Sequence, residues 1–326
     1  MEYRLFGKTG VEVSILGFGM MRLPILNNDP GQIDKAEATR MVRMAIDQGV
    51  NYIDTAYGYH KGQSEHFTRE ALGDGYRDKV FLATKMPTYL VKEKADFERF
   101  FQEQKTKLGT DRTDMYLLHT LNQKRWDLIN GLDVLEFLEE KRKAGEIRFF
   151  GFSFHDDYPA FESIVNTYDW DFCQIQFNYV DTNLQAGLKG YQLAESLGIP
   201  MIVMEPVKGG SLAKLPAAME AFFRTLRPHD SVASWAFRFV ASHPNVKVIL
   251  SGMSTMEQIH AAVDVLGLEN LVITHATSTY PCEPDELNLR MIQTMQQEFP
   301  CPIGYSGHEV GPVSYTHLTL PTIYSV

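Results

Sequence analysis

Residues 80–119 read VFLATKMPTYLVKEKADFERFFQEQKTKLGTDRTDMYLLH, and this stretch contains the repeating unit of the fold. It opens with a short apolar run at Val80–Lys85 and continues with an amphipathic segment at Lys94–Leu108. It then returns to an apolar run at Asp114–His119. This order predicts a buried strand, a covering helix and a second strand parallel to the first.

The same alternation extends in both directions along the chain. The expected strands are Ser14–Met20, Asn51–Thr55, Val80–Lys85, Asp114–His119, Ile147–Ser153, Phe172–Phe177, Met201–Glu205 and Val246–Gly252. The expected helices are Lys35–Gln48, Ser64–Leu72, Lys94–Leu108, Leu128–Lys143, Pro159–Thr167, Leu184–Ser196, Ser231–Ser242 and Met256–Leu266. Eight such units within roughly 250 residues predict an α/β fold of the (β/α)8 TIM barrel type.

Two segments lie outside the repeating units. Glu2–Val13, with Lys8-Thr9-Gly10 at its turn, predicts a β-hairpin that closes the bottom of the barrel. An open doubly wound sheet is the alternative, but Gly17-Phe18-Gly19 lacks the third glycine of a dinucleotide loop and no helix follows it directly. We therefore expect a barrel domain over residues 1–298 and an irregular tail over 299–326. The polar, Thr-rich Ser314–Val326 is expected to be an assembly artefact.

The composition excludes several classes of protein. The 326 residues include 31 Lys and Arg against 41 Asp and Glu, a formal charge of −10, which disfavours binding to nucleic acid or to an anionic membrane. Three cysteines are too few for a disulfide framework, and no apolar run approaches the roughly 18 residues of a membrane helix. We expect a soluble cytoplasmic protein, either a monomer or a small homo-oligomer.

Polar and ionisable side chains follow the expected strands, where barrel enzymes carry their function. The loop after the second strand adds Tyr59 to this set. Since the carboxyl ends of parallel strands meet at one end of a barrel, these groups are expected to converge. The residues at the strand ends are Asp54, Lys85, His119, Ser153, Gln174 and Glu205.

These positions suit the reduction of a carbonyl group. No side chain donates hydride, so a nicotinamide cofactor is required. Tyr59 can donate the proton, and the ammonium of Lys85 is expected to lower the pKa of the phenol from its usual ~10. The carboxylate of Asp54 would keep Lys85 charged, while His119 would donate a hydrogen bond to the carbonyl oxygen.

Five segments resemble the signature segments of the aldo-keto reductase family, in order and with suitable spacing over roughly Met1 to Leu266. They are Asp54–Tyr59, Ala83–Lys85, Tyr116–His119, Gly151–Ser153 and Gln174–Asn178. The resemblance implies NAD(P)H-dependent reduction of an aldehyde or ketone, with a small-molecule carbonyl as the partner. It also implies a catalytic tetrad of Tyr59, Lys85, Asp54 and His119, with Tyr59 as general acid.

The resemblance further implies how a dinucleotide would lie across the barrel. Ser153 and Gln174 would bind the nicotinamide carboxamide, and Met204 would pack on the ring where many members have an aromatic residue. The residues after the seventh strand resemble the pyrophosphate loop of the family. They are Glu205, Lys208, Gly209 and Gly210.

The adenosine end departs from the family pattern. Gly252 and Gln258 stand where the family commonly has cations that grip a 2′-phosphate, although a helix start at Ser254 could still receive an anion. We therefore expect either a weak preference for NADP or acceptance of NAD. No metal site is expected, and no iron–sulfur cluster, although the most similar bacterial branch often carries a cysteine-rich C-terminal segment for one.

Two other functions stay open at this point. The first is a nicotinamide-binding sensor with little turnover. It is favoured by the departures at Met204, Gly252 and Gln258, and by Phe154, which stands where many members of the family have Asn. The second is a Schiff-base lyase with Lys85 as nucleophile, which would require a neutral amine.

Overall fold

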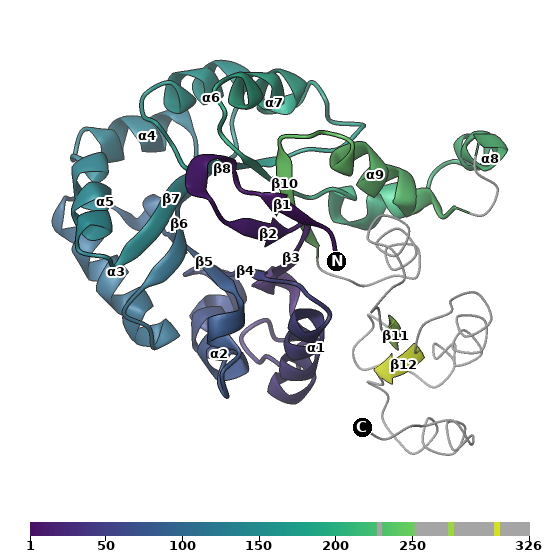
Figure 1. Cartoon of the computed structure of the whole chain (residues 1–326), viewed down its shortest axis with the longest axis horizontal. Helices are drawn as coiled ribbons and strands as arrows, with labels where there is room; N and C mark the ends of the chain where they lie inside the picture. The colour runs from purple at the N-terminus through teal and green to yellow at the C-terminus, as the bar shows by residue number, and fades with distance from the viewer. Residues whose placement is uncertain (227–229, 252–272, 277–302, 307–326) are drawn as a thin grey trace.

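Eight parallel strands close into a barrel in the computed structural model, which describes residues 1–226, 230–251, 273–276 and 303–306 (Figure 1). Neighbours in the chain are neighbours in the barrel, and the last strand pairs with the first. The predicted barrel is confirmed, and closure excludes the open sheet. The strands are β3 (Leu16–Gly19), β4 (Tyr52–Asp54), β5 (Phe81–Met86), β6 (Thr113–Leu121), β7 (Ile147–Phe154), β8 (Phe172–Gln176), β9 (Met201–Met204) and β10 (Val246–Ser251).

Helices surround the strands, as Figure 1 shows. Their ends follow local signals in the sequence: Asp34 and Ser231 cap the first and last described helices, and Gly109 takes a left-handed conformation (φ 62°) at the end of another. The helices are α1 (Lys35–Asp47), α2 (Ser64–Ala71), α3 (Ala95–Leu108), α4 (Gln123–Asn130), α5 (Val134–Lys143), α6 (Tyr158–Val165), α7 (Gly187–Ser196), α8 (Ala217–Leu226) and α9 (Val232–Ala241).

The predicted helices differ from the structure in two places. The single helix expected at Leu128–Lys143 is wrong, because the chain breaks between α4 and α5, where Asp133 takes a left-handed conformation (φ 63°). Helix α8 was not predicted at all. The helix expected at Met256–Leu266 lies outside the described residues.

The N-terminal hairpin closes the amino end of the barrel. Strands β1 (Tyr3–Leu5) and β2 (Glu12–Ser14) pair antiparallel, and the Phe6 ring between them lies 5.5 Å from the ring of Phe172, at the start of β8. Arg4 donates a hydrogen bond of 2.7 Å to the carbonyl of Val246, at the start of β10. The predicted plug is confirmed, and it lies at the end of the barrel opposite to the candidate site residues.

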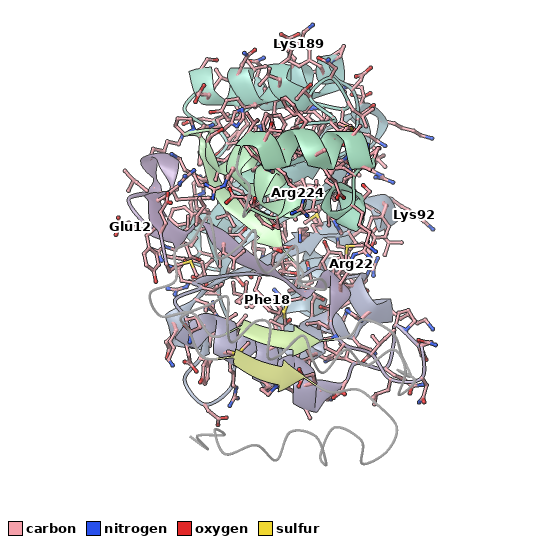
Figure 2. The ribbon with its side chains drawn as sticks, turned by 90° about the vertical axis from the view of Figure 1, so that its right-hand side faces the viewer. Glu12, Phe18, Arg22, Lys92, Lys189 and Arg224 are labelled. Atoms are coloured by element: carbon pink, nitrogen blue, oxygen red, sulfur yellow. The ribbon has the colours of Figure 1, made fainter. Side chains whose placement is uncertain are left out.

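The core has one layer inside the barrel and others between the strands and the helices. Phe6 joins the inner layer, whose buried members include Tyr52, Met115, Phe172 and Ile202. Charged side chains such as Lys92 and Lys189 point outward at the periphery (Figure 2). Among the described ranges, no helix is both long and apolar enough to cross a membrane.

Residues 303–306, the part of the tail that the structure describes, form a strand. Strand β12 (Ile303–Ser306) falls inside the segment expected to be irregular, and it pairs in parallel with β11 (Ile273–Ala276). Its sequence, Ile-Gly-Tyr-Ser, contains two residue types that favour strands, and this signal was overlooked among the neighbouring glycines.

Candidate active site

The structure brings the phenol, the amine and the carboxylate together at the carboxyl ends of β4 and β5. The Nζ atom of Lys85 donates to Asp54 Oδ1 at 2.6 Å and to the carbonyl of Thr55 at 2.8 Å. The same atom lies 3.4 Å from the hydroxyl of Tyr59, which follows β4 in the loop before α2. A single ammonium therefore contacts the carboxylate and the phenol that the sequence singled out.

Lys85 is held in its charged form. The side chain is fully buried and burial opposes its charge, but the neighbouring Asp54 and Tyr59 outweigh burial and raise the pKa of the ammonium. The second carboxylate oxygen of Asp54 has no hydrogen-bond partner among the described residues. A protonated amine cannot attack a carbonyl carbon, so this geometry counts against the Schiff-base alternative.

Tyr59 does not have the lowered pKa that we expected. Burial raises the pKa of the phenol above its ordinary value, and the opposing effect of Lys85 is smaller. The expectation was wrong because it considered the neighbouring charge and left out desolvation. A phenol that stays protonated at neutral pH can still donate a proton, which is the role required of it.

His119 lies beside Tyr59 at the carboxyl end of β6. Its ring centroid is 5.8 Å from that of Tyr59 and 6.0 Å from that of Tyr89. Burial, and then the charge of Lys85, lower the pKa of the imidazole well below its ordinary value. A neutral imidazole keeps one N–H with which it can donate a hydrogen bond to a carbonyl oxygen.

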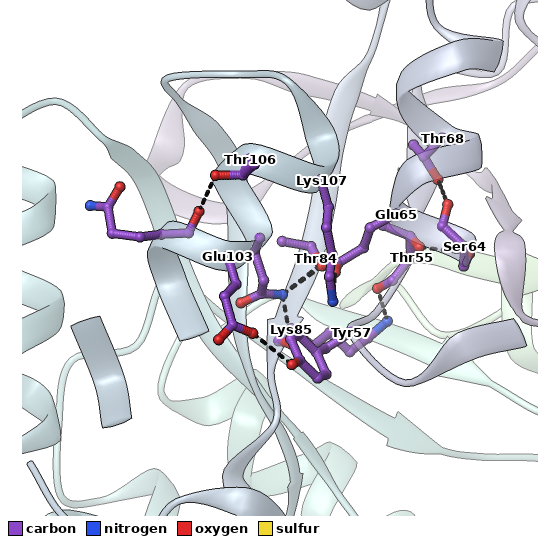
Figure 3. A network of polar contacts seen from close by, with 12 residues as sticks. Thr55, Tyr57, Ser64, Glu65, Thr68, Thr84, Lys85, Glu103, Thr106 and Lys107 are labelled. Carbon is purple, nitrogen blue, oxygen red and sulfur yellow. Dashed lines mark hydrogen bonds and ion pairs between the residues drawn. The ribbon is translucent and has the colours of Figure 1, made fainter. Parts of the chain in front are cut away.

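A buried polar network behind the barrel wall fixes the strand that carries Lys85 (Figure 3). Glu65 of α2 accepts hydrogen bonds from Thr84 at 2.6 Å and from Gln104 of α3 at 2.7 Å. The Nε2 atom of Gln104 also lies 3.0 Å from the carbonyl oxygen of Lys85, and the hydroxyl of Tyr116 donates to Gln104 Oε1 at 2.7 Å. The sequence analysis missed this network, because Glu65 and Gln104 look like ordinary polar residues of amphipathic helices.

The loop that presents Tyr59 is anchored by the next residue. His60 takes a left-handed conformation (φ 52°), and its ring is buried. The Nε2 atom accepts from the amide of Leu23 at 3.1 Å, and Nδ1 lies 2.8 Å from the carbonyl oxygen of Pro30. Both partners belong to the loop between β3 and α1, so His60 ties two loops together beside the phenol.

Ser153 and Gln174 fit the predicted nicotinamide site. They are neighbours in register on β7 and β8, and both are buried. The Oε1 atom of Gln174 has no partner among the described residues, while its Nε2 lies 3.6 Å from the sulfur of Met204. The hydroxyl of Ser153 accepts from the amide of Thr120 at 2.7 Å. A buried, unpaired amide oxygen is what a carboxamide N–H group requires.

The loop after β9, where the sequence predicts a pyrophosphate loop, has an unusual backbone. Glu205, Lys208, Gly209 and Gly210 all have positive φ angles, from 50° to 94°. The ammonium of Lys208 lies 2.7 Å from Oδ1 of Asp181. The other carboxylate oxygen of Asp181 accepts hydrogen bonds from Gln176 and Asn178. Asp181 was missed, although the amide-rich end of β8 was a signal for it.

Other predicted residues lie elsewhere or outside the described part. Gly252, Ser254 and Gln258 fall outside it, so the adenosine end stays a prediction. Among the aromatic residues in the loops at this end of the barrel, Trp126 is in the core and Tyr57 packs on α3, whereas Tyr89 contacts His119. Among the residues that the structure describes, no three His, Cys, Asp or Glu side chains are grouped as a metal site.

Comparisons with known proteins agree with the fold of this chain. Residues 15–277 match the model of the Aldo/keto reductase family. The uncharacterized oxidoreductase YqkF of Bacillus subtilis is 24% identical over 308 residues, which cover 83% of this chain and 93% of that protein. The crystal structure of an aldo-keto reductase from Klebsiella pneumoniae in complex with NADPH superposes with a TM-score of 0.62 and 20% identity, covering 93% of this chain and 97% of that one.

A separate similarity is confined to a short stretch. The N-acetylneuraminate-9-phosphate synthase of Homo sapiens is 47% identical over 68 residues. That stretch makes up 20% of this chain and 19% of the synthase. A fifth of an enzyme does not carry its activity, so the comparison adds no function to this chain.

Proposed function

Since this chain belongs to the aldo/keto reductase family, we propose that it reduces an aldehyde or a ketone to an alcohol with NADPH or NADH. The observation that carries the proposal is the position of the Lys85 ammonium, 2.6 Å from Asp54 and 3.4 Å from the hydroxyl of Tyr59. The NADPH bound to the Klebsiella pneumoniae reductase supports a nicotinamide cofactor for a fold of this kind.

Four side chains at this site have different roles in the proposed reaction. A reduced nicotinamide, when bound, supplies the hydride that adds to the carbonyl carbon. His119 donates a hydrogen bond to the carbonyl oxygen and polarises it. Tyr59 transfers its proton to that oxygen as negative charge develops there, so that an alcohol leaves the site. The ammonium of Lys85 stabilises the resulting phenolate, and Asp54 keeps the ammonium charged.

The residues that would hold the nicotinamide lie beside this group. The unpaired oxygen of Gln174 would accept from the carboxamide, Ser153 would contact the same group, and the partly exposed Met204 would pack on the ring. Lys208 and the two glycines that follow it would receive the pyrophosphate. For the adenosine end we keep the sequence-based proposal that the preference for NADP is weak.

Replacing Tyr59 with Phe tests the proposal. The variant is expected to lose turnover by roughly 10²-fold or more, because general acid catalysis typically contributes 10²–10⁴. Its dissociation constant for NADPH should stay close to that of the wild type, because only a hydroxyl is removed. Steady-state oxidation of NADPH with a panel of aldehydes and ketones measures the first quantity, and fluorescence titration measures the second.

The outcome also separates a reductase from a sensor. Turnover by the wild type that depends on Tyr59 supports the reductase. NADPH binding without turnover of any carbonyl would favour the sensor that the sequence left open. Near wild-type reduction by the Phe variant would remove Tyr59 from the mechanism.

A further inference from the structure

Arg125 is a cation at the carboxyl end of the barrel that the reaction described above does not use. It lies in the first turn of α4, directly after β6, which carries His119. Its backbone N–H donates to the capping side chain of Asn122 at 2.8 Å, so the start of the helix is fixed. Its guanidinium reaches back toward the end of β6, because Nη1 donates to the carbonyl of Thr120 at 2.6 Å and to its hydroxyl at 3.0 Å.

These contacts place a positive charge next to the catalytic histidine. Thr120 follows His119 directly and takes a left-handed conformation (φ 51°). The pKa of His119 is lowered mainly by burial, and Arg125 adds to the lowering together with Lys85. For the pKa of Tyr89, which burial raises, the charge of Arg125 has an opposing effect. The charge of the guanidinium therefore acts on the rings of both His119 and Tyr89.

No carboxylate neutralises this charge in the part of the chain that the structure describes. The two contacts with Thr120 use only Nη1, which leaves the Nε and Nη2 donors without a protein partner among the described residues. The other arginines of the central helices are paired: Arg99 with Asp96, and Arg142 with Asp171. Arg125 is half-buried, and a guanidinium with free donors can pair with a carboxylate through two parallel hydrogen bonds.

The wall next to Arg125 is apolar. Tyr89 and Leu90 lie in the short turn after β5 and are 42% and 41% exposed. Tyr89 packs its ring edge against His119, and the next residue in the chain, Thr120, accepts the hydrogen bond from Arg125. A flat or extended carbon skeleton with its carbonyl at Tyr59 and His119 would lie along this wall. The formal charge of the whole chain is −10, so any attraction of an anion here must come from a local cation.

We propose that Arg125 determines substrate specificity by binding a carboxylate carried by the carbonyl substrate. The inference rests on the proposed function and narrows its substrate class to carbonyl compounds with an anionic group. Thr120 holds one edge of the guanidinium, and the free edge pairs with the carboxylate. The carbonyl carbon of the same molecule then lies at the catalytic groups.

Two aldehydes of nearly equal shape test the charge. These are 4-carboxybenzaldehyde, which is an anion at neutral pH, and 4-formylbenzamide, its neutral isostere. The wild type is expected to prefer the anion by roughly tenfold or more in kcat/KM, as a charge-assisted hydrogen bond would give. The Arg125→Gln variant should lose this preference, mainly through a higher KM for the anion. Lys124→Gln is the matched control, because it removes the same charge from the exposed adjacent position and should keep the preference.

A structural role of Arg125 predicts a different result. If the guanidinium only holds Thr120, the Gln variant will lose activity equally with both aldehydes, and the proposal fails. It also fails if the variant keeps its preference while its dissociation constant for NADPH rises, since Arg125 would then serve the cofactor.

Binding of benzoate, measured by calorimetry, makes the test independent of turnover. The wild type and Lys124→Gln should bind benzoate at least tenfold more tightly than Arg125→Gln. Equal binding by all three proteins overturns the role of Arg125 even if the chain is an active reductase. Selective benzoate binding without turnover of any aldehyde would count against the reductase and leave the anion site standing.

Discussion

At the scale of the single residue, the protonation of the proposed catalytic groups depends strongly on their neighbours. Lys85 keeps its proton although it is fully buried, because Asp54 is 2.6 Å away. His119 is neutral because burial and the same lysine both oppose a second positive charge. One ammonium thus acts on the protonation of the groups around it, although burial has the larger effect at Tyr59 and His119. A change at Asp54 would therefore be felt at all of them.

The hydrogen bonds of the His60 ring require the neutral form of the imidazole. Since Nδ1–H faces the carbonyl of Pro30, Nε2 must remain unprotonated to accept from Leu23. Burial lowers the pKa of His60 below its ordinary value of 6.5. Below pH 6.5 the unfolded chain therefore binds more protons here than the folded chain does. Its contribution to stability is present above pH 6.5 and is lost as the pH falls.

Replacing His60 with Gln should reduce this loss. The amide can accept from Leu23 and donate to Pro30 without titrating. Urea unfolding between pH 7.5 and 5.5 is expected to show a smaller decrease in the free energy of unfolding than in the wild type. The difference in slope should reach at most about 1.4 kcal/mol per pH unit, the limit for one proton. His66→Gln, on the exposed face of α2, is the control and should keep the wild-type slope. Parallel curves for wild type and His60→Gln would show that this histidine does not link the fold to pH.

At the scale of the element, α2 and α3 hold strand β5 from outside through Glu65 and Gln104 (Figure 3). We predict that Gln104→Leu costs about 2–4 kcal/mol in the free energy of unfolding. The leucine would leave the Tyr116 hydroxyl without its partner and the Glu65 carboxylate with fewer donors. Urea unfolding monitored by circular dichroism measures the cost.

The same helix supplies a matched control for that experiment. Gln102 is exposed and donates only to Glu98, at 2.8 Å, so Gln102→Leu should change stability by no more than about 0.5 kcal/mol. Equal effects of the two substitutions would mean that the buried network adds nothing beyond ordinary helix packing.

The elements show what the sequence could and could not predict. The strands were predictable because a parallel strand covered on both faces is a continuous apolar run, and all eight were found. Lys85 and Tyr59 stood out because each is a polar group at or just beyond the end of such a run. Asp133, in contrast, gave no signal that it would take a left-handed conformation before α5, since this conformation depends on its tertiary surroundings. Arg125 gave no signal either. In the sequence it looks like its neighbours Gln123 and Lys124, as an ordinary polar residue on the surface of a helix.

At the scale of the whole molecule, the residues that close the barrel and the proposed catalytic residues lie at opposite ends of it. The hairpin and the aromatic residues around Phe6 close the amino end, whereas Asp54, Lys85 and His119 lie at the carboxyl ends of their strands. The packed interior layer lies between these two ends. A defect at the closed end should therefore change the stability of the fold and leave the geometry of the reacting groups unchanged.

Phe6→Ala tests this separation. Phe6 is fully buried against Phe172, and the loss of a buried aromatic ring typically costs about 3–5 kcal/mol in the free energy of unfolding. Leu5→Ala, next to it but 57% exposed, should cost no more than about 0.5 kcal/mol. At a temperature where both variants are folded, kcat/KM for aldehyde reduction should equal that of the wild type. A loss of kcat/KM in folded Phe6→Ala would show instead that the hairpin and the reacting groups are coupled through the barrel.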